Sequence, residues 1–271
     1  MFAHPEEQAL CDRFLKDLYV IIPVEDQVGL DRIRDKVVAL AAKHLGISVP
    51  NDTQAFLDTI HQRITVEQLN GLRMTVFNAM NAENWFRPTY LSLARQAVET
   101  LIGNELALQR RINLSVQLPK DDSSLLPIHA DVWDGDSPYE VVVWLPLVNC
   151  FKTKSMYIMP AAQDRDEQEK LARFASGSAE DIYQEMAERM VFLDVPYGHI
   201  LLFSQTVMHG NRINDEVTTR WSMNCRVKSL LSPYADKRLG EFFEPIIVRP
   251  ATRIGANYRL PQGFELQEGD K

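Results

Sequence analysis

Cysteine is scarce in this chain of 271 residues. The three cysteines, Cys11, Cys150 and Cys225, lie far apart and are odd in number, which fits neither a disulfide framework nor a paired-cysteine metal motif. Unpaired thiols are typical of a reducing compartment. We therefore expect a cytoplasmic protein.

Long hydrophobic runs and a basic charge balance are missing too. The longest apolar segments, such as residues 141–146, are far shorter than the roughly 20 residues of a membrane span. Acidic side chains occupy the first 17 residues, where a secretory signal would carry basic ones. The formal net charge of −8 argues against a nucleic-acid partner, because phosphate binding requires clustered Lys and Arg. We expect no membrane span, no nucleic-acid partner and a small-molecule substrate.

Several catalytic motifs are absent from the sequence. It contains no Gly-rich phosphate loop, no HExxH and no GxSxG. These absences exclude the usual P-loop nucleotidases, zinc proteases and serine hydrolases. The composition, 45% hydrophobic and 24% charged, is that of an ordinary globular domain and not of a disordered chain or a coiled coil.

The first hundred or so residues predict helices. Apolar side chains recur at helical spacing across residues 26–46. Further helices are expected to start near residue 51 and to cover residues 66–80 and 88–103. We interpret residues 1–105 as a helical layer that packs on the domain after it.

The pattern changes to short strands from residue 106 onward. Apolar and polar side chains alternate across residues 112–118, which indicates a half-buried strand. Turn-forming residues separate this strand from further strand-like runs at residues 139–147, 155–159, 190–193, 199–204 and 220–230. Short strands of this kind predict a sandwich or barrel, which we place in residues 106–232.

Two segments fall outside the strand pattern. Residues 163–190 are rich in charge and in helix formers, which predicts a helical insertion divided at Gly177. This insertion is either a solvated excursion, a lid or a subunit contact. Residues 233–271 contain four prolines and predict a loop-rich C-terminal tail of the same structural domain. The oligomeric state stays open, with the N-terminal helices and the insertion as candidate interfaces of a homo-oligomer.

One spacing carries the chemistry: His129-Ala130-Asp131, followed far downstream by His209. Residues i and i+2 of an extended segment point the same way, so one strand end can present an imidazole and a carboxylate to one metal. A histidine from a neighbouring strand completes a 2-His-1-carboxylate face, which leaves positions open on Fe(II) for a cosubstrate and O₂. The competing interpretation is a surface His–Asp pair beside a structural histidine of the barrel.

The context of the spacing matters because a His-X-acid pattern also occurs at His4-Pro5-Glu6, in the helical N-terminal segment. Only the second pattern lies between predicted strands. Arg220 follows His209 by eleven residues and starts a predicted strand. A guanidinium at that point can bind a dicarboxylate through two parallel hydrogen bonds. Alternatively, Arg220 is the partner of a structural ion pair.

These ordered segments resemble a known family. HAD, GHILLFSQTVMHGN and TTRWSMNCR resemble the Fe(II)/2-oxoglutarate-dependent dioxygenases of the phytanoyl-CoA dioxygenase superfamily. The stretch from NLSVQLP to TKSMYIMP is most similar to the branch found in carbohydrate and aminocyclitol biosynthetic clusters of the streptomycin type. The resemblance implies a mainly β fold with α-helices: a double-stranded β-helix, or jelly-roll (cupin-like) barrel, with an N-terminal helical layer and a helical insertion.

The resemblance also implies roles for particular residues. The Fe(II) ligands it implies are His129, Asp131 and His209. For 2-oxoglutarate, it implies that Arg220 holds the distal carboxylate. Further cosubstrate contacts that it implies are Asn211, Gln117 and Trp144, each of which has a structural alternative, and Arg226 is the fallback for Arg220.

The function implied is hydroxylation of a small polar substrate, with O₂ as cosubstrate and release of succinate and CO₂. A sugar, a nucleotide-sugar or an aminocyclitol precursor fits the branch. Cationic side chains that would meet its phosphate or hydroxyl groups are Lys152, Lys154, Arg212 and Arg226. Alternatives are an epimerisation or desaturation outcome, a lipid or acyl substrate, and a non-catalytic cupin-like barrel that binds metal or sugar. No catalytic side chain beyond the metal centre is expected.

Overall fold

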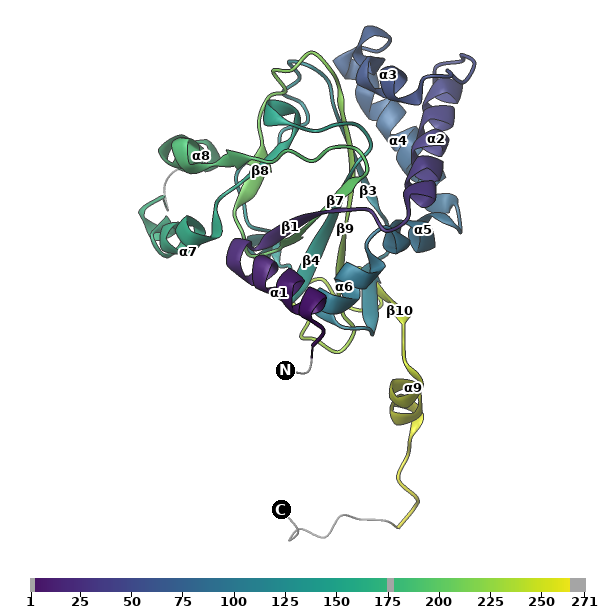
Figure 1. Ribbon diagram of the computed structural model, residues 1–271, viewed down its shortest axis with the longest axis vertical. Coiled ribbons are helices and arrows are strands. Elements are labelled where there is room, and N and C mark those ends of the chain that lie inside the picture. Colours follow the sequence, from purple (N-terminus) through teal and green to yellow (C-terminus); the bar gives the residue numbers. More distant parts are fainter. Residues whose placement is uncertain (1–2, 175–177, 264–271) are drawn as a thin grey trace.

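The computed structural model describes residues 3–174 and 178–263, which form a two-sheet barrel with helices on its outside (Figure 1). The strands are β1 (Tyr19–Pro23), β2 (Leu106–Gln109), β3 (Asn113–Gln117), β4 (Glu140–Pro146), β5 (Met156–Ile158), β6 (Val191–Phe192), β7 (His199–Ser204), β8 (His209–Asn211), β9 (Arg220–Ser229) and β10 (Phe243–Ile247). The α-helices are α1 (Pro5–Asp17), α2 (Gln27–His44), α3 (Thr53–Asp58), α4 (Val66–Ala82), α5 (Phe86–Ser92), α6 (Arg95–Ile102), α7 (Ala161–Glu169), α8 (Ala179–Met186) and α9 (Pro250–Asn257).

Antiparallel pairing organises both sheets. The large sheet has the order β1-β7-β4-β9-β2-β10, and β3 pairs with the first half of the long strand β9. The small sheet has the order β6-β5-β8. Figure 1 shows the small sheet facing the large one across the barrel. The barrel predicted from the alternating strands is therefore present.

The central strand β4 of the large sheet is buried along its whole length. Every residue of β4 is buried, as a run of β-branched side chains between two neighbouring strands predicts. In the β4–β9 register, Val142 lies opposite Arg226 and Trp144 lies opposite Asn224. Because opposite residues of paired strands share a face, these four side chains belong to one face of the sheet.

A helical layer covers the outside of this sheet. The N-terminus of α2 is capped by Asp26, whose carboxylate accepts a hydrogen bond from the backbone N–H of Gly29 at 2.8 Å. The apolar stripe of α2, including Leu30, Ile33 and Val37, joins the main hydrophobic core. This helix packs against α4 and α5, and α4 in turn packs against β3. Within the described ranges, no helix is both long and apolar enough to cross a membrane.

Two strands of the large sheet come from segments where the sequence predicted none. β1 lies within the helical N-terminal region and pairs with β7, and β10 lies within the predicted loop-rich tail and pairs with β2. The tail prediction is wrong at β10 and α9. Both strands have five residues, lie at the edges of the sheet and contain a proline, so their sequence pattern is weak.

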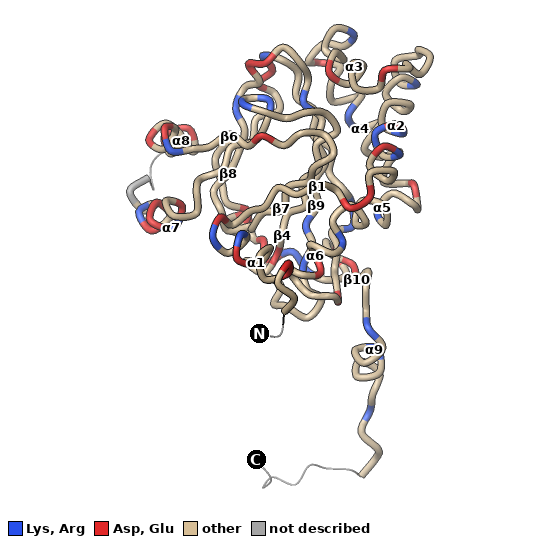
Figure 2. Tube along the Cα trace, viewed as in Figure 1, with Lys and Arg blue, Asp and Glu red and all other residues tan. Residues whose placement is uncertain are grey.

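The insertion forms the two helices α7 and α8, which lie outside the small sheet (Figure 1). Both signs of charge are mixed along them (Figure 2). Gly177, the predicted division point, lies outside the described residues. α7 also contacts the start of β8, because the Asp164 carboxylate accepts a 2.8 Å hydrogen bond from the backbone N–H of Met208, the residue before this strand.

Candidate metal centre

His129, Asp131 and His209 meet between the two sheets. The backbones of His129 and His209 exchange two hydrogen bonds, of 3.0 and 2.8 Å, so the two histidines lie directly opposite each other. Ala130 is extended, which places Asp131 on the same side of the chain as His129. Their potential ligand atoms all lie within 4.8 Å of one another. The structure thus brings together the three residues that the sequence predicts as metal ligands.

Backbone carbonyls orient both imidazoles. Nδ1 of His129 lies 2.8 Å from the carbonyl oxygen of Pro127, and Nδ1 of His209 lies 3.0 Å from that of Val207. A carbonyl oxygen only accepts, so each Nδ1 carries a proton, and in the neutral form of each ring the lone pair is on Nε2. The two Nε2 atoms lie 3.6 and 3.9 Å from the carboxylate oxygens of Asp131. All three donors therefore point into one space.

The protonation states of the centre also suit a metal. Burial lowers the pKa of His209 to about 4, so this imidazole is neutral at pH 7. Burial alone would raise the pKa of Asp131, but the hydrogen bond with His129 and the charge of Arg226 hold it below its ordinary value. Burial opposes the charged form of His129, whereas its contacts with Asp131 and Pro127 raise its pKa. A raised pKa favours a proton on Nε2 of His129, and a metal ion would displace this proton on binding.

The donor set fits Fe(II). Two neutral imidazoles and one carboxylate are the protein ligands of the non-haem iron face, and softer thiolate ligands are not among them. Within the residues that the structure describes, this is the one group of three such side chains close enough to share an ion. Three ligands on one side leave the other coordination positions free for small molecules.

Arg220 is a buried cation without an anionic partner. Its side chain is on the first residue of β9, 3% of the residue is exposed, and Nη2 donates a 3.1 Å hydrogen bond to the hydroxyl of Ser115. In the described part of the chain no carboxylate pairs with it, and its buried Nε has no hydrogen-bond partner. Burial lowers the pKa of Arg220 to about 10, so the guanidinium remains charged at pH 7. A buried charge of this kind is costly unless an anion binds it.

One cavity joins Arg220 to the metal centre. Trp144, Arg220 and His209 all line it, together with Ser115, Asn211, Ser222 and Asn224. An anion held by Arg220 would therefore lie in the same cavity as His209, one of the three candidate ligands. This arrangement suits a short molecule that has a carboxylate at one end and metal-binding oxygens at the other.

The amides of Gln117 and Asn211 are already used within the protein. Gln117 is fully buried and donates a 2.8 Å hydrogen bond to the backbone carbonyl of Arg212. Asn211 donates to the Gln117 side chain and to the carbonyl of Ser124, and accepts from the backbone N–H of Leu126. Asn211 lines the cavity, whereas Gln117 is not among its lining residues. Cosubstrate contact by these two residues stays a prediction.

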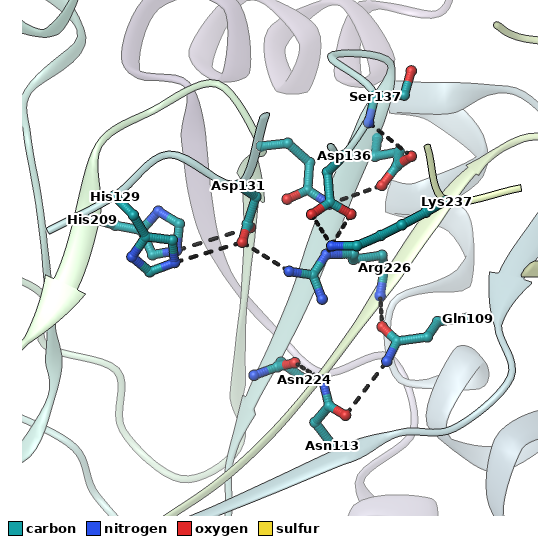
Figure 3. A network of polar contacts seen from close by, with 12 residues as sticks. Gln109, Asn113, His129, Asp131, Asp136, Ser137, His209, Asn224, Arg226 and Lys237 are labelled. Carbon is teal, nitrogen blue, oxygen red and sulfur yellow. Dashed lines mark hydrogen bonds and ion pairs between the residues drawn. The ribbon is translucent and has the colours of Figure 1, made fainter. Parts of the chain in front are cut away.

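Arg226 lies on the same face of β9 as Arg220, as strand alternation predicts, but it already forms ion pairs with two carboxylates. Its Nη2 donates to Oδ1 of Asp131 at 2.8 Å, and its Nε forms an ion pair with Asp136 at 3.0 Å (Figure 3). Arg226 therefore has two carboxylate partners, which argues against the fallback role of holding 2-oxoglutarate.

Sequence reasoning missed the ion network behind Asp131. Residues Asp131–Asp134 form a short 3-10 turn, and Gly135, at φ +83°, reverses the chain so that the Asp136 carboxylate also faces Arg226. Lys237 pairs with the other oxygen of Asp136. The signal was the dipeptide Gly135-Asp136, which begins four residues after Asp131, since glycine is the residue that readily adopts this backbone conformation.

Besides Arg226, two more of the cations predicted to meet substrate have partners within the protein. The buried ammonium of Lys154 lies 2.6 Å from Asp58 and donates to Thr218. Arg212 forms an ion pair with Glu180 of α8 at 2.5 Å. These contacts tie the barrel to the helical layer and to the insertion.

Comparisons with known proteins identify the fold. No family model and no curated protein matches the chain. Among solved structures, it is similar to the non-heme monooxygenase ThoJ with nickel (16% identity, 83% of this chain and 79% of that one, TM-score 0.52). It is also similar to EctD from S. alaskensis in its apo form (13%, 86% and 79%, TM-score 0.56). A third is HygX from Streptomyces hygroscopicus with nickel and 2-oxoglutarate bound (12%, 88% and 90%, TM-score 0.51). These neighbours confirm the predicted fold class, a double-stranded β-helix with added helices.

Proposed function

We propose that this chain is an Fe(II)/2-oxoglutarate-dependent oxygenase. The observation that carries the proposal is the buried, unpaired guanidinium of Arg220 in the same cavity as the metal-ligand candidate His209. An isolated His-Asp-His group would also fit a simple metal-binding barrel. A buried guanidinium without an anionic partner beside the His-Asp-His group favours an anionic ligand in addition to the metal. HygX, a structural neighbour, holds nickel and 2-oxoglutarate.

Each residue of the site would have a distinct task. When bound, Fe(II) and 2-oxoglutarate supply the oxidation by O₂, with release of succinate and CO₂. His129, Asp131 and His209 would hold the metal through two nitrogens and one oxygen. Arg220 would pair with the distal carboxylate and so fix the cosubstrate along β9. Trp144, opposite Asn224 in the sheet, would form one apolar wall of the cosubstrate cavity.

A polar substrate fits the space beside this cavity. A groove of about 500 Å³ runs between α4 and the segment 123–126, and its walls share Ser115, Leu126 and Asn224 with the inner cavity. Arg73 and uncharged polar residues such as Asn70 line it, and none of its lining residues in the described part of the chain is acidic. Amide and hydroxyl groups both donate and accept hydrogen bonds, as the hydroxyl groups of a sugar require. This supports a carbohydrate-derived substrate and the branch that the sequence resembles.

The cofactor part of the proposal is tested under anaerobic conditions. Addition of Fe(II) and then of 2-oxoglutarate to the purified protein should produce a weak visible charge-transfer band. The band should be lost in His129→Ala and strongly weakened in Arg220→Ala at the same 2-oxoglutarate concentration. A metal-binding barrel without this function would bind Fe(II) and give no band with 2-oxoglutarate.

The substrate part needs a separate assay. Sugars, nucleotide-sugars, aminocyclitols and acyl thioesters are added in turn to the aerobic holoenzyme, and both succinate and the mass of each candidate are measured. A gain of one oxygen in a carbohydrate supports the proposal. Loss of two hydrogens indicates desaturation, an isomer of unchanged mass indicates epimerisation, and oxidation of an acyl thioester alone contradicts a carbohydrate substrate.

Compartment and assembly are also part of the proposal. Cys150 and Cys225 are buried free thiols, which suits a reducing cytoplasm. The N-terminal helices and the insertion remain the candidate interfaces of a homo-oligomer. Light scattering coupled to gel filtration measures the mass in solution, and a monomeric mass would contradict the oligomer.

A further inference from the structure

We propose that Arg226 is the positioning residue of the metal centre: it holds one oxygen of Asp131 and leaves the other as the metal ligand. The inference rests on the metal site of the proposed function, but not on the identity of its cosubstrate or substrate. It starts from the geometry of a single carboxylate. Oδ1 of Asp131 accepts the 2.8 Å hydrogen bond from Nη2 of Arg226. Oδ2 is therefore the oxygen without a guanidinium partner.

The guanidinium is itself held on two sides. Nη2 contacts Asp131 and Nε pairs with Asp136, whose side chain is completely buried (Figure 3). Because the guanidinium is planar, contacts at two of its nitrogens fix its orientation as well as its position. Lys237 pairs with the second oxygen of Asp136 and so keeps that carboxylate in place. The orientation of Asp131 is thus determined from behind.

The backbone of Arg226 is fixed just as firmly. It lies in the centre of the large sheet, opposite Val142 of β4. Its backbone N–H donates a 3.1 Å hydrogen bond to the side-chain oxygen of Gln109 on β2. Since the sheet holds the Cα atom and two carboxylates hold the guanidinium, Arg226 can transmit the rigidity of the sheet to a metal ligand on a loop.

Electrostatics give Arg226 a second effect on the same ligand. Its positively charged Nη2 lies 2.8 Å from Oδ1 of Asp131, and a cation at this distance favours the ionised carboxylate over the neutral acid. A carboxylate must be ionised to bind a metal, and partners behind metal ligands typically contribute about 10- to 100-fold in metal affinity. We expect loss of Arg226 to weaken the metal site by a factor in this range.

The experiment measures Co(II) binding to the apo-protein, with and without oxygen-free 2-oxoglutarate, by the visible absorption of the metal. Arg226→Gln removes both the positive charge and the planar guanidinium. Arg226→Lys keeps the charge but cannot contact Asp131 and Asp136 through a planar group. The matched control is Arg87→Gln. Arg87 is similarly buried, with 21% of its side chain exposed against 16% for Arg226, and it pairs with Glu244 away from the metal ligands.

The expected result is a loss of Co(II) affinity of about 10- to 100-fold in Arg226→Gln, with a changed absorption spectrum of the bound metal. Arg226→Lys should lie between it and the wild type, and Arg87→Gln should bind Co(II) as the wild type does. Unchanged affinity and spectrum in Arg226→Gln would overturn the inference. If that variant does not fold, wild-type affinity and spectrum in Arg226→Lys would overturn it instead.

Failure of the metal site itself looks different. If the wild type does not bind Co(II), or if His129→Ala binds it equally well, then the ligand assignment is wrong and the proposed function fails with it. If Co(II) binds but 2-oxoglutarate does not alter its spectrum, only the cosubstrate assignment fails. The comparison of Arg226 with Arg87 remains decisive in that case.

Discussion

Two arginines on the same face of strand β9 have opposite surroundings. Arg220 and Arg226 lie six residues apart on the same face of β9. Arg220 is buried with a hydroxyl partner and no carboxylate, whereas Arg226 is shared between Asp131 and Asp136. An arginine whose charge is satisfied by the protein serves the architecture. One whose charge is left unsatisfied is available to a ligand.

The largest expected effect comes from breaking the ion pair of Arg226 with Asp131, because Asp131 is also a candidate metal ligand. Asp131→Ala removes a direct ligand and leaves the Arg226 charge with one carboxylate fewer. We expect Co(II) affinity to fall by more than the roughly 100-fold upper value for a residue behind a ligand. Calorimetric titration of the apo-protein measures it. An affinity within tenfold of the wild type would show that Asp131 is not a ligand.

Replacing Arg220, which has no carboxylate partner, should lower the affinity for 2-oxoglutarate and leave the affinity for the metal unchanged. Arg220→Gln removes the only partner we assign to the distal carboxylate, a loss worth about 2 kcal/mol or more, or roughly 30-fold in the affinity for 2-oxoglutarate. Co(II) affinity should stay within about twofold of the wild type. Arg220→Lys should lose less, because it keeps the charge without the fork.

Replacing each arginine by methionine extends the comparison to thermal stability. Without 2-oxoglutarate, Arg220→Met should unfold at a temperature equal to or higher than the wild type, since it removes a buried, unpaired charge. Arg226→Met should unfold at a lower temperature, because it leaves two buried carboxylates without their shared partner. Equal losses in the two variants would contradict the distinction between them.

The pH dependence of stability reports on the network behind Arg226. Burial, together with the nearby charge of Asp136, raises the pKa of Glu140 from its ordinary 4.5 to about 7. The folded protein therefore keeps a proton that the unfolded chain has lost, so stability falls as pH rises between about 4.5 and 7. The fall is at most roughly 3 kcal/mol. Denaturant unfolding of Glu140→Gln should show a flatter pH profile in this window, and an unchanged profile would contradict the assignment.

The smallest expected effect is at Gln117. Its amide bonds to a backbone carbonyl and to Asn211, so Gln117→Ala should lower the free energy of unfolding by about 1–3 kcal/mol. If the amide serves only this structural purpose, the affinity for 2-oxoglutarate should change less than threefold. A larger loss of affinity with unchanged stability would show that Gln117 contacts the cosubstrate.

Local patterns predicted what local physics determines. His129 and Asp131 lie close together and Arg220 faces the cavity beside His209, as the HAD spacing and the alternation along β9 predict, because an extended backbone fixes which side chains share a face. The apolar run of residues 141–146 in β4 was equally clear. Edge strands β1 and β10 were not, since each has five residues and gains its pairing only from a distant part of the chain.

Partners were harder to predict than positions. Arg226 was placed on the correct face, but nothing local showed that Asp136 and Lys237 would meet it, because that contact depends on a turn and on a segment after β9. In the same way, nothing local showed that the amides of Gln117 and Asn211 would bond to each other and to backbone carbonyls. Which polar group a side chain meets is decided by tertiary structure.

The pairing of β1 with β7 has a consequence for how the protein is made. Tyr19 at the start of the chain lies opposite Phe203, so this strand emerges from the ribosome long before its partner exists. The helices between them have local contacts and can form early, but the sheet closes only after most of the chain is synthesised. Until then β1 presents an unpaired apolar edge. We therefore expect release of the nascent chain before residue 204 to yield an aggregation-prone product.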